Sequence, residues 1–439
     1  MQRQQSIAFE GRDSETPLNE KLSAKYIRSF AYYTVKDRLP VILTKVINDL
    51  VTNKSRILQE HNKDEVEEDL KSIIGKISKL KNELVTNKTL VKLNSKGDDI
   101  TSWNDYLDLN LNSETEQHCW YYSPWLLVEC YMYRRLWEVV ENSEFLQDLD
   151  PFACKKEEAF YMALNEIKTV AKSCLTTLKG GMTEIKDTFI KYLKLSLWSN
   201  HCDLSLSNGN QISGDECSTL TQLNSLDSFL LCEDSLKVFK YLEKNPGGVI
   251  DFVTDNAGYE AYCDFCFCDL LCTSSLVSKI RFHVKKLPWY VSDLTRNDIK
   301  WMLDRLEKEG ISELSARWKK YFDDGVWSIY EENYWTMPFG YKDMKTKDLE
   351  LYNYLSQSCL VIFKGDLNYR KLLDDINWST TENFGIVLRD FKPSSILTLR
   401  TIKSDVVCGL PPGKSDQLSE KDKMWMRTGD YAVIQFYEA

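Results

Sequence analysis

The sequence predicts an α/β protein in which a helical N-terminal lobe packs on a three-layer α/β/α lobe with a mostly parallel sheet. In the first part of the chain, apolar residues recur at three- and four-residue spacing, which is typical of helices that bury one face. In the second part, strand-like apolar runs alternate with helix-like ones, and such alternation predicts a parallel sheet covered on both faces. The length of 439 residues exceeds the usual size of one domain and fits two closely packed lobes.

These patterns divide the chain into four expected parts. Residues 1–24 are expected to form a flexible N-terminal tail, and residues 25–199 a mostly helical lobe. Residues 200–234 are rich in Ser, Asn, Gly and Asp, which predicts a loop that connects the lobes. Residues 235–439 are expected to form the α/β/α lobe that binds metal and phosphate.

Two segments carry the helical prediction most clearly. HNKDEVEEDLKSIIGKISKLKNEL (61–84) has charged residues on one face and apolar residues on the other. SPWLLVECYMYRRLWEVV (123–140) is largely apolar and opens with Ser and Pro, which favour the start of a helix.

The expected strands lie between helix-like segments such as AYCDFCFCDLLC (261–272). Each strand-like run is short and rich in apolar and β-branched residues, as in strands buried on both faces. The runs are GVIDFVT (248–254), KIRFHVKKLPWYVS (279–292), CLVIFK (359–364), SSILTLRTIK (394–403) and YAVIQFY (431–437).

The composition limits the partners and the compartment. A formal net charge of −10 predicts no general attraction to nucleic acid or to anionic membranes, so a phosphate group would need a local cluster of Lys and Arg. No stretch approaches the roughly 20 apolar residues that span a bilayer, and the first residues lack the apolar core of an export signal. Thirteen scattered cysteines then predict reduced thiols in an intracellular compartment, the cytosol and/or the nucleus.

Polar side chains follow three of the expected strands. Asp255 and Asn256 follow the first, Asp293 follows the second, and Asp366 follows the third. In parallel sheets ligands bind at the carboxyl ends of strands, so these side chains are expected to converge in one crevice. Carboxylate and amide oxygens suit a hard divalent cation. The alternative is that Asp-Asn after a strand is simply a turn or a helix cap.

Cations that could pair with a phosphoryl group lie in the same segments. They are Lys364, Arg370, Arg400 and Lys403.

Several motifs together resemble those of a known family. They mark subfamily III of the damage-control phosphatases, which is also called the acidic residue methyltransferase family, and the resemblance covers almost the whole chain beyond the first twenty or so residues. The matching segments are DNAGYE (255–260), PWYVSD (288–293), FKGDLNYRKL (363–372) and RTIK (400–403), with SFAYYTVKDRLPVILTKVINDL (29–50) and SPWLLVECYMYRRLWE (123–138) in the helical lobe.

This resemblance implies a phosphatase that uses a divalent metal such as Mn, Co, Ni or Mg. The implied substrates are small phosphorylated metabolites, above all sugar phosphates such as fructose 1-phosphate and fructose 6-phosphate. By motif position, Asp255, Asn256 and Asp293 are the expected metal ligands, and Asp255 is the expected catalytic residue. The expected substrate contacts are Asp255, Asn256, Asp366, Leu367, Asn368, Tyr369, Arg370 and Lys403.

One segment departs from the family pattern. LWSNHCDLSL (197–206) has Ser199 where the family usually has Gly, and His201 where it has another residue. The loop around Asn200 and Asp203 is therefore expected to shape the pocket differently, and substrate preference transfers less securely than metal binding.

The alternative function is an S-adenosylmethionine-dependent protein-glutamate O-methyltransferase. Under it, Glu260 and Asp293 are the cofactor contacts that the resemblance implies, and the substrate is a protein. Common methyltransferases have a Gly-rich turn after their first strand, and this chain has no G-x-G. A binding module that merely keeps the fold is a third possibility. The sequence leaves open the native metal, the oligomeric state, and whether Asp255 or a metal-bound water attacks.

Overall fold

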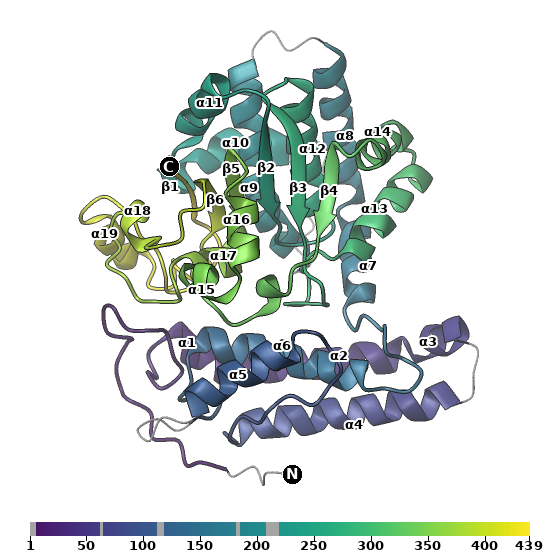
Figure 1. Cartoon of the computed structure of the whole chain (residues 1–439), viewed down its shortest axis with the longest axis vertical. Coiled ribbons are helices and arrows are strands. Elements are labelled where there is room, and N and C mark those ends of the chain that lie inside the picture. Colours follow the sequence, from purple (N-terminus) through teal and green to yellow (C-terminus); the bar gives the residue numbers. More distant parts are fainter. Residues whose placement is uncertain (1–5, 62–64, 112–117, 181–184, 208–218) are drawn as a thin grey trace.

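The computed structural model describes residues 6–61, 65–111, 118–180, 185–207 and 219–439. Its helices and strands form two packed lobes, a smaller helical one that contains the first helices and a larger one built around a sheet (Figure 1). No helix in these ranges is long and apolar enough to cross a membrane.

The helical lobe is an assembly of amphipathic helices around the nearly all-buried helix α6. In α4 the buried residues Leu70, Ile73, Ile77 and Leu80 recur at three- and four-residue spacing, as the sequence pattern predicts. Pro124 caps α6, where the missing proline N–H costs nothing. The elements are α1 (Phe30–Tyr33), a π-helical turn (Thr34–Arg38), α2 (Leu39–Thr52), α3 (Lys54–His61), α4 (Glu65–Val85), α5 (Ile100–Leu111) and α6 (Trp125–Glu141).

The larger lobe contains a seven-stranded sheet with the order β1-β7-β6-β5-β2-β3-β4. Strand β2 pairs in parallel with β3 and β5, and β6 pairs with β7 antiparallel, so the sheet is mostly parallel and the expected α/β class is confirmed. The strands are β1 (Leu230–Glu233), β2 (Gly248–Val253), β3 (Val277–His283), β4 (Trp327–Tyr330), β5 (Leu360–Lys364), β6 (Ser395–Thr401) and β7 (Ala432–Tyr437).

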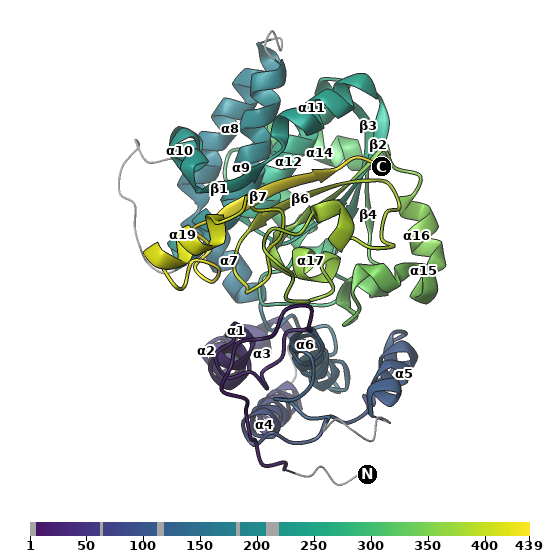
Figure 2. The ribbon, with the colours of Figure 1, turned by 90° about the vertical axis from the view of Figure 1, so that its left-hand side faces the viewer.

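Helices cover both faces of this sheet. One apolar core packs helices α7–α9 and α11–α14 against one face of the sheet. A second apolar core packs helices α16–α19 and the helical lobe against the opposite face (Figure 2). The helices are α7 (Ala153–Met162), α8 (Leu164–Lys179), α9 (Ile185–Ser207), α10 (Thr219–Leu226), α11 (Ser235–Lys244), α12 (Tyr259–Thr273), α13 (Arg296–Lys308), α14 (Ser312–Asp323), α15 (Met344–Lys347), α16 (Leu349–Leu355), α17 (Gly365–Leu372), α18 (Phe384–Val387) and α19 (Lys414–Lys421), with short 3-10 turns at Asp227–Phe229, Asn333–Thr336 and Tyr341–Asp343.

The structure differs from the expected boundary between the lobes. Helices α7 to α9 pack on the sheet, so the separate helical lobe ends near α6 and not at residue 199. Within the expected connection 200–234, helix α9 continues to Ser207, and α10 and β1 follow; residues 208–218 lie outside the described ranges. The Ser- and Asn-rich composition predicts a loop, but packing of Leu197 and Trp198 overrides this weak propensity.

The expected N-terminal tail also differs where the structure describes it, from residue 6. Leu22 and Ala24 are buried, and the Leu22 N–H donates to the Asp375 carbonyl at 2.8 Å. Asn19 N–H donates to the Asn377 carbonyl at 2.7 Å. These contacts hold residues 19–24 against the larger lobe, because buried backbone groups need partners.

The second expected strand is shorter than its apolar run. It ends at His283, ten residues before Asp293, so Asp293 lies in a loop and not at a strand end. Pro288 lacks an N–H for the sheet ladder, and Tyr290 and Val291 take φ values of 44° and 72°, which a strand cannot contain.

The helical lobe lies over the carboxyl ends of β2, β3 and β5 (Figure 1). A buried ion-pair group joins the lobes there: Arg370 Nε lies 2.7 Å from Asp375 Oδ1, and its Nη1 lies 2.6 Å from Glu129 Oε2 on α6. Its guanidinium also stacks 3.6 Å from the ring centre of Trp125. A planar guanidinium suits such combined pairing and stacking.

Candidate active site

The candidate site lies where the chain order of the sheet reverses. Strand β2 neighbours β3 on one side and β5 on the other, so the loops that follow β2 and β5 diverge at this point. Such a switch point leaves a crevice at the carboxyl ends of the strands. Asp255 follows β2, and Gly365 and Asp366 follow β5. The sheet topology therefore brings together the first and third of the expected motifs.

Two amides bridge two buried carboxylates at this point. Asn200 Nδ2, from helix α9, donates to Asp255 Oδ2 at 2.9 Å and to Glu260 Oε2 at 2.6 Å. Asn256 Nδ2 donates to the same two oxygens at 3.1 and 2.7 Å. Glu260 is fully buried and Asp255 nearly so. The two carboxylates are thus held side by side by neutral donors.

Asp293 approaches from the loop after β3. Residues Asn256 and Asp293 form an isolated backbone bridge, and the Leu294 N–H donates to the Asp255 carbonyl at 2.8 Å. Asp293 Oδ2 lies 3.0 Å from Lys285 Nζ, and both side chains are almost fully buried. We call Asp255, Glu260 and Asp293 the acid cluster.

Helix α12 begins beside the acid cluster. Gly258 takes a φ of 73° just before the helix, which directs the chain from β2 into α12. Glu260 lies in the first turn, where the free N–H groups and the helix dipole stabilise a negative charge.

Burial and mutual repulsion perturb the acid cluster. Burial raises the pKa of Asp255 well above its ordinary value, and the charges of Glu260 and Asp293 raise it further, while Lys403 and Lys285 oppose this rise. Burial also raises the pKa of Asp293, against the influence of Lys285. Adjacent carboxylates away from water favour either a proton or a nearby cation.

The loop after β6 adds cations on the other side. Lys403 Nζ donates to Asn200 Oδ1, and Thr401 Oγ1 donates to the same oxygen at 2.6 Å. Arg400 Nη2 lies 2.7 Å from Asp366 Oδ1, which also accepts the Lys403 N–H at 3.0 Å. Burial is the largest influence and raises the pKa of Asp366, but Arg400, Arg370 and the Lys403 N–H together outweigh it, so the net shift is downward. Asp366 therefore fixes the RTIK segment as an ionised carboxylate.

The other expected phosphate-binding cations are already paired. Lys364 lies behind the cluster, with Nζ 3.1 Å from Glu260 Oε1 and 2.6 Å from Asp264 Oδ1. Arg370 lies between Asp375 and Glu129, as described above. Among Lys364, Arg370, Arg400 and Lys403, only Lys403 has its amino group at Asn200 beside the acid cluster.

Three residues of the DLNYR segment point to other parts of the structure. Asn368 Nδ2 donates to the carbonyls of Thr254 and Lys364, at 3.2 and 2.7 Å. The Tyr369 hydroxyl donates to Gln435 Oε1 at 2.8 Å, and Leu367 belongs to the apolar core. Their expected contacts with substrate stay predictions.

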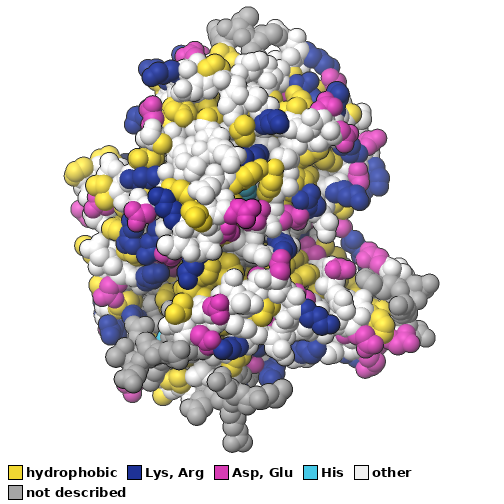
Figure 3. Space-filling view, in the orientation of Figure 1, with side chains coloured by type: hydrophobic (Ala, Val, Ile, Leu, Met, Phe, Trp, Pro, Cys, Tyr) yellow, Lys and Arg dark blue, Asp and Glu magenta, His cyan; other side chains and the backbone are white. Residues whose placement is uncertain are grey.

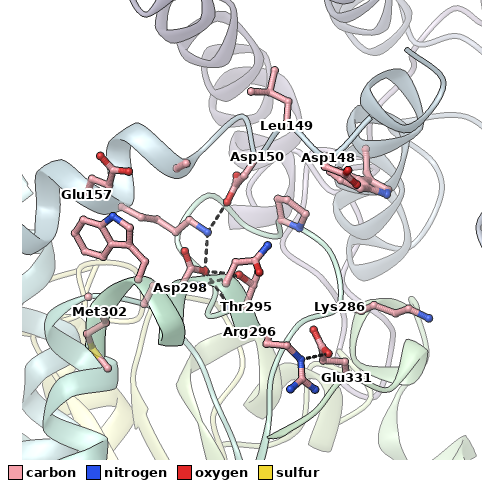
Figure 4. Close-up of a pocket in the computed structure, with 18 of the residues that line it drawn as sticks. Asp148, Leu149, Asp150, Glu157, Lys286, Thr295, Arg296, Asp298, Met302 and Glu331 are labelled. Carbon is pink, nitrogen blue, oxygen red and sulfur yellow. Dashed lines mark hydrogen bonds and ion pairs between the residues drawn. The ribbon is translucent and has the colours of Figure 1, made fainter. Parts of the chain in front are cut away.

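A groove of about 690 Å³ opens beside the site, between the lobes (Figure 4). Its wall includes Ala257 and Gly258, which directly follow Asn256, and Thr295, which lies two residues after Asp293. Asp148, Asp150 and Lys156 line the facing side, and Lys156 Nζ bridges Asp150 and Asp298 at 2.6 and 2.7 Å. The side chains of the acid cluster do not line the groove.

The donor set at the acid cluster fits a hard divalent cation. Asp255 and Asp293 contribute carboxylate oxygens, and Asn256 carries an amide oxygen, so the residues match the oxygen ligands that such ions take. Within the described residues, no three His, Cys, Asp or Glu side chains are grouped closely enough to hold a metal ion by themselves. The expected set includes the amide of Asn256 beside the two carboxylates.

Comparison with known proteins identifies the family. Residues 34–418 match the damage-control phosphatase ARMT1-like domain. The chain belongs to the damage-control phosphatase ARMT1 family. The damage-control phosphatase ARMT1 of Danio rerio is 38% identical over 435 residues, which cover 95% of this chain and 96% of the relative. Those of Mus musculus and Homo sapiens are 39% and 37% identical, each over 94% of this chain and 98% of the relative.

The resemblance noted in the sequence is thereby confirmed for the family. A solved DUF89 family protein from Pyrococcus horikoshii is 14% identical with a TM-score of 0.42, over 89% of this chain and 97% of that chain.

Three residues of the site have contacts that only the fold shows. Asn200 lies 55 positions before Asp255, within a segment whose composition suggests a loop. Lys285 follows β3 as one of two adjacent lysines, and only the fold shows that it pairs with Asp293. Gly365 takes a φ of 83°, and a Cβ placed there would lie 2.0 Å from Asp255 Oδ2. The glycine in FKGDLNYRKL therefore makes room for the Asp255 carboxylate.

We predict that Gly365→Ala inactivates the protein while Gly247→Ala does not. Both glycines have positive φ, 83° and 77°, so both substitutions strain the backbone by roughly 1–2 kcal/mol. Only at position 365 does the new methyl group collide with Asp255, whereas nothing lies within 4 Å at position 247. Displacement of a reacting group by about 1 Å can cost on the order of 100-fold in rate.

The measurement is phosphate release from a sugar phosphate by both variants, alongside their thermal unfolding. Equal activity losses in the two variants would show that backbone strain, and not the contact with Asp255, is the reason for a glycine at position 365.

Proposed function

We propose that this chain is a metal-dependent phosphomonoesterase that hydrolyses small phosphorylated metabolites, above all sugar phosphates such as fructose 1-phosphate and fructose 6-phosphate. The observation that carries the proposal is the buried acid cluster beside a lysine, Lys403, that reaches the same asparagine, Asn200. The membership of the damage-control phosphatase family supports it.

The proposed metal ligands are Asp255, Asn256 and Asp293, and the ion is Mn, Co, Ni or Mg. A divalent cation bound there supplies positive charge for the phosphoryl oxygens and lowers the pKa of a bound water. Lys285 holds Asp293 in place through the 3.0 Å ion pair. Asn200 holds Asp255 and Glu260 at fixed separation.

Lys403 is the proposed phosphate contact. Lys403 is partly exposed, and its ammonium group donates to the Asn200 amide oxygen, a neutral partner that a phosphate can replace. On the face shown in Figure 3, side chains of both charges are interspersed, so attraction of an anion depends on such a focal cation. Asp255 is the proposed catalytic carboxylate, as nucleophile or as the group that holds the attacking water.

Cover by the helical lobe supports a small substrate. Tyr290, on the loop that carries Asp293, stacks on Tyr133 of α6 with ring centres 4.6 Å apart. The groove between the lobes reaches Ala257, Gly258 and Thr295, which are close in sequence to the proposed metal ligands. A free metabolite is small enough to approach the site from this groove, whereas a glutamate on a folded protein must bring its backbone to the opening.

We predict that phosphate release from fructose 1-phosphate and fructose 6-phosphate requires a divalent metal. EDTA should abolish the release, because the acid cluster then lacks the charge that neutralises the phosphoryl group, and Mn, Co, Ni or Mg should restore it. The measurement is inorganic phosphate over a panel of sugar phosphates with each metal added back.

Phosphate release at an unchanged rate in the presence of EDTA would contradict the metal mechanism. Methyl transfer from S-adenosylmethionine that survives EDTA and exceeds phosphate release, in the same preparation, would make the methyltransferase function primary.

We also predict that Lys403→Ala lowers kcat/KM by about ten- to a hundredfold, the loss of one hydrogen bond to a charged group. Lys423→Ala is the matched control, since Lys423 is an exposed lysine outside the site. Both variants should unfold at the temperature of the unchanged protein within error. Equal kcat/KM values for Lys403→Ala and Lys423→Ala would place Lys403 outside the site.

A further inference from the structure

The orientation of the Asn256 amide is set by Ser292, a residue of the PWYVSD segment to which the resemblance assigns no role. Ser292 Oγ donates a hydrogen bond to Asn256 Oδ1 at 2.6 Å. On the other side of the same amide, Nδ2 donates to Asp255 and Glu260, at 3.1 and 2.7 Å. The amide oxygen is therefore turned away from the acid cluster, and its N–H groups face the carboxylates.

This orientation matters for cation binding. A cation binds the oxygen of an amide and not its NH₂ group, which has no lone pair to offer. Asn256 can therefore act as a ligand only after its amide has turned by half a revolution about its last torsion. That torsion is broad and roughly two-fold in asparagine, so rotation is limited by the hydrogen bonds of the amide and not by the side chain itself.

We propose that Ser292 is the positioning residue for this rotation, an inference that rests on the proposed metal-dependent function. A serine hydroxyl can both donate and accept. Without a cation, Ser292 donates to the amide oxygen; with a cation at the acid cluster, the turned amide donates its N–H to Ser292 Oγ. Ser292 thus holds Asn256 in each of its two orientations.

The surrounding backbone places Ser292 for this role. Its carbonyl accepts the Ala257 N–H at 2.8 Å, which ties the loop to the segment just after Asn256. The two preceding residues, Tyr290 and Val291, have φ values of 44° and 72°. Positive φ at a β-branched residue is costly and persists only where the surroundings impose it.

Packing from the helical lobe imposes this turn. Tyr290 stacks on Tyr133 of α6, and the Asp293 N–H closes the turn on the Trp289 carbonyl at 3.1 Å. The same strained turn therefore presents Ser292 to Asn256 and, one residue later, Asp293 to the acid cluster.

The test is Mn²⁺ binding by isothermal titration calorimetry to the full chain and to three variants. Ser292→Ala removes one hydrogen bond in both states, but in the free protein the Asn256 NH₂ group keeps its bonds to Asp255 and Glu260. In the bound orientation the NH₂ group has turned away from these carboxylates and is left without a partner, so the variant should raise the Mn²⁺ Kd on the order of tenfold. Ser292→Thr, which keeps the hydroxyl, should restore the affinity to within about threefold. Ser315→Ala is the matched control: Ser315 Oγ makes a buried hydrogen bond to the Leu303 carbonyl at 2.8 Å, remote from the motifs.

Thermal unfolding of each variant, with and without Mn²⁺, separates positioning from general stability. Under the proposal, Ser292→Ala reduces the increase in Tm that Mn²⁺ produces, while Ser315→Ala lowers both Tm values equally. A Kd for Ser292→Ala equal to that of the unchanged protein would overturn this inference and leave the proposed function standing. Absence of Mn²⁺ binding by the unchanged protein, with activity insensitive to EDTA, would overturn the proposed function and the inference together.

Discussion

The main constraint on this structure is the burial of three carboxylates: Asp255 after strand β2, Glu260 in the first turn of α12, and Asp293 in the loop after β3. Buried charges are costly unless they are paired, and like charges in one site repel each other. The chain compensates from distant elements, with Asn200 from α9 and Lys285 from the loop after β3. Asn200 bridges Asp255 and Glu260, and Gly365 leaves room for the Asp255 carboxylate.

A second buried group of charges, around Arg370, joins the helical lobe to the larger lobe. Arg370, in a motif that the resemblance assigns to substrate, uses its guanidinium to join Asp375 and Glu129 across the lobes. Loss of one partner from such a buried group leaves an unpaired charge, which costs about 3–5 kcal/mol. Arg370 therefore helps to hold the helical lobe against the larger lobe, and its expected contact with phosphate stays a prediction.

The sequence predicts that polar residues directly after strands β2 and β5 meet in one site. It does not predict the contacts that helix α9 and the loop after β3 make with them. Asp255 after β2 and Asp366 after β5 could be expected to meet because parallel strands end at one edge. For Asn200 the sequence predicts a loop that shapes the pocket, since its surroundings are rich in Ser and Asn. In the structure Asn200 lies in helix α9, which packs on α12, and it contacts Asp255 and Glu260. Strands β1 and β4 have four residues each, which is too short for a clear strand pattern in the sequence. Asp293 lies in a loop, but the apolar residues before it make the sequence predict a strand there.

The central claim is that the acid cluster is a divalent cation site. The most direct measurement is anomalous diffraction from crystals grown with Mn²⁺ and phosphate. The account predicts one strong Mn²⁺ peak within ligand distance, about 2.0–2.4 Å, of oxygens from Asp255, Asn256 and Asp293, with the Asn256 amide turned and phosphate near Lys403. No peak at these residues at millimolar Mn²⁺, or a peak confined to the groove around Asp148 and Asp150, would contradict it.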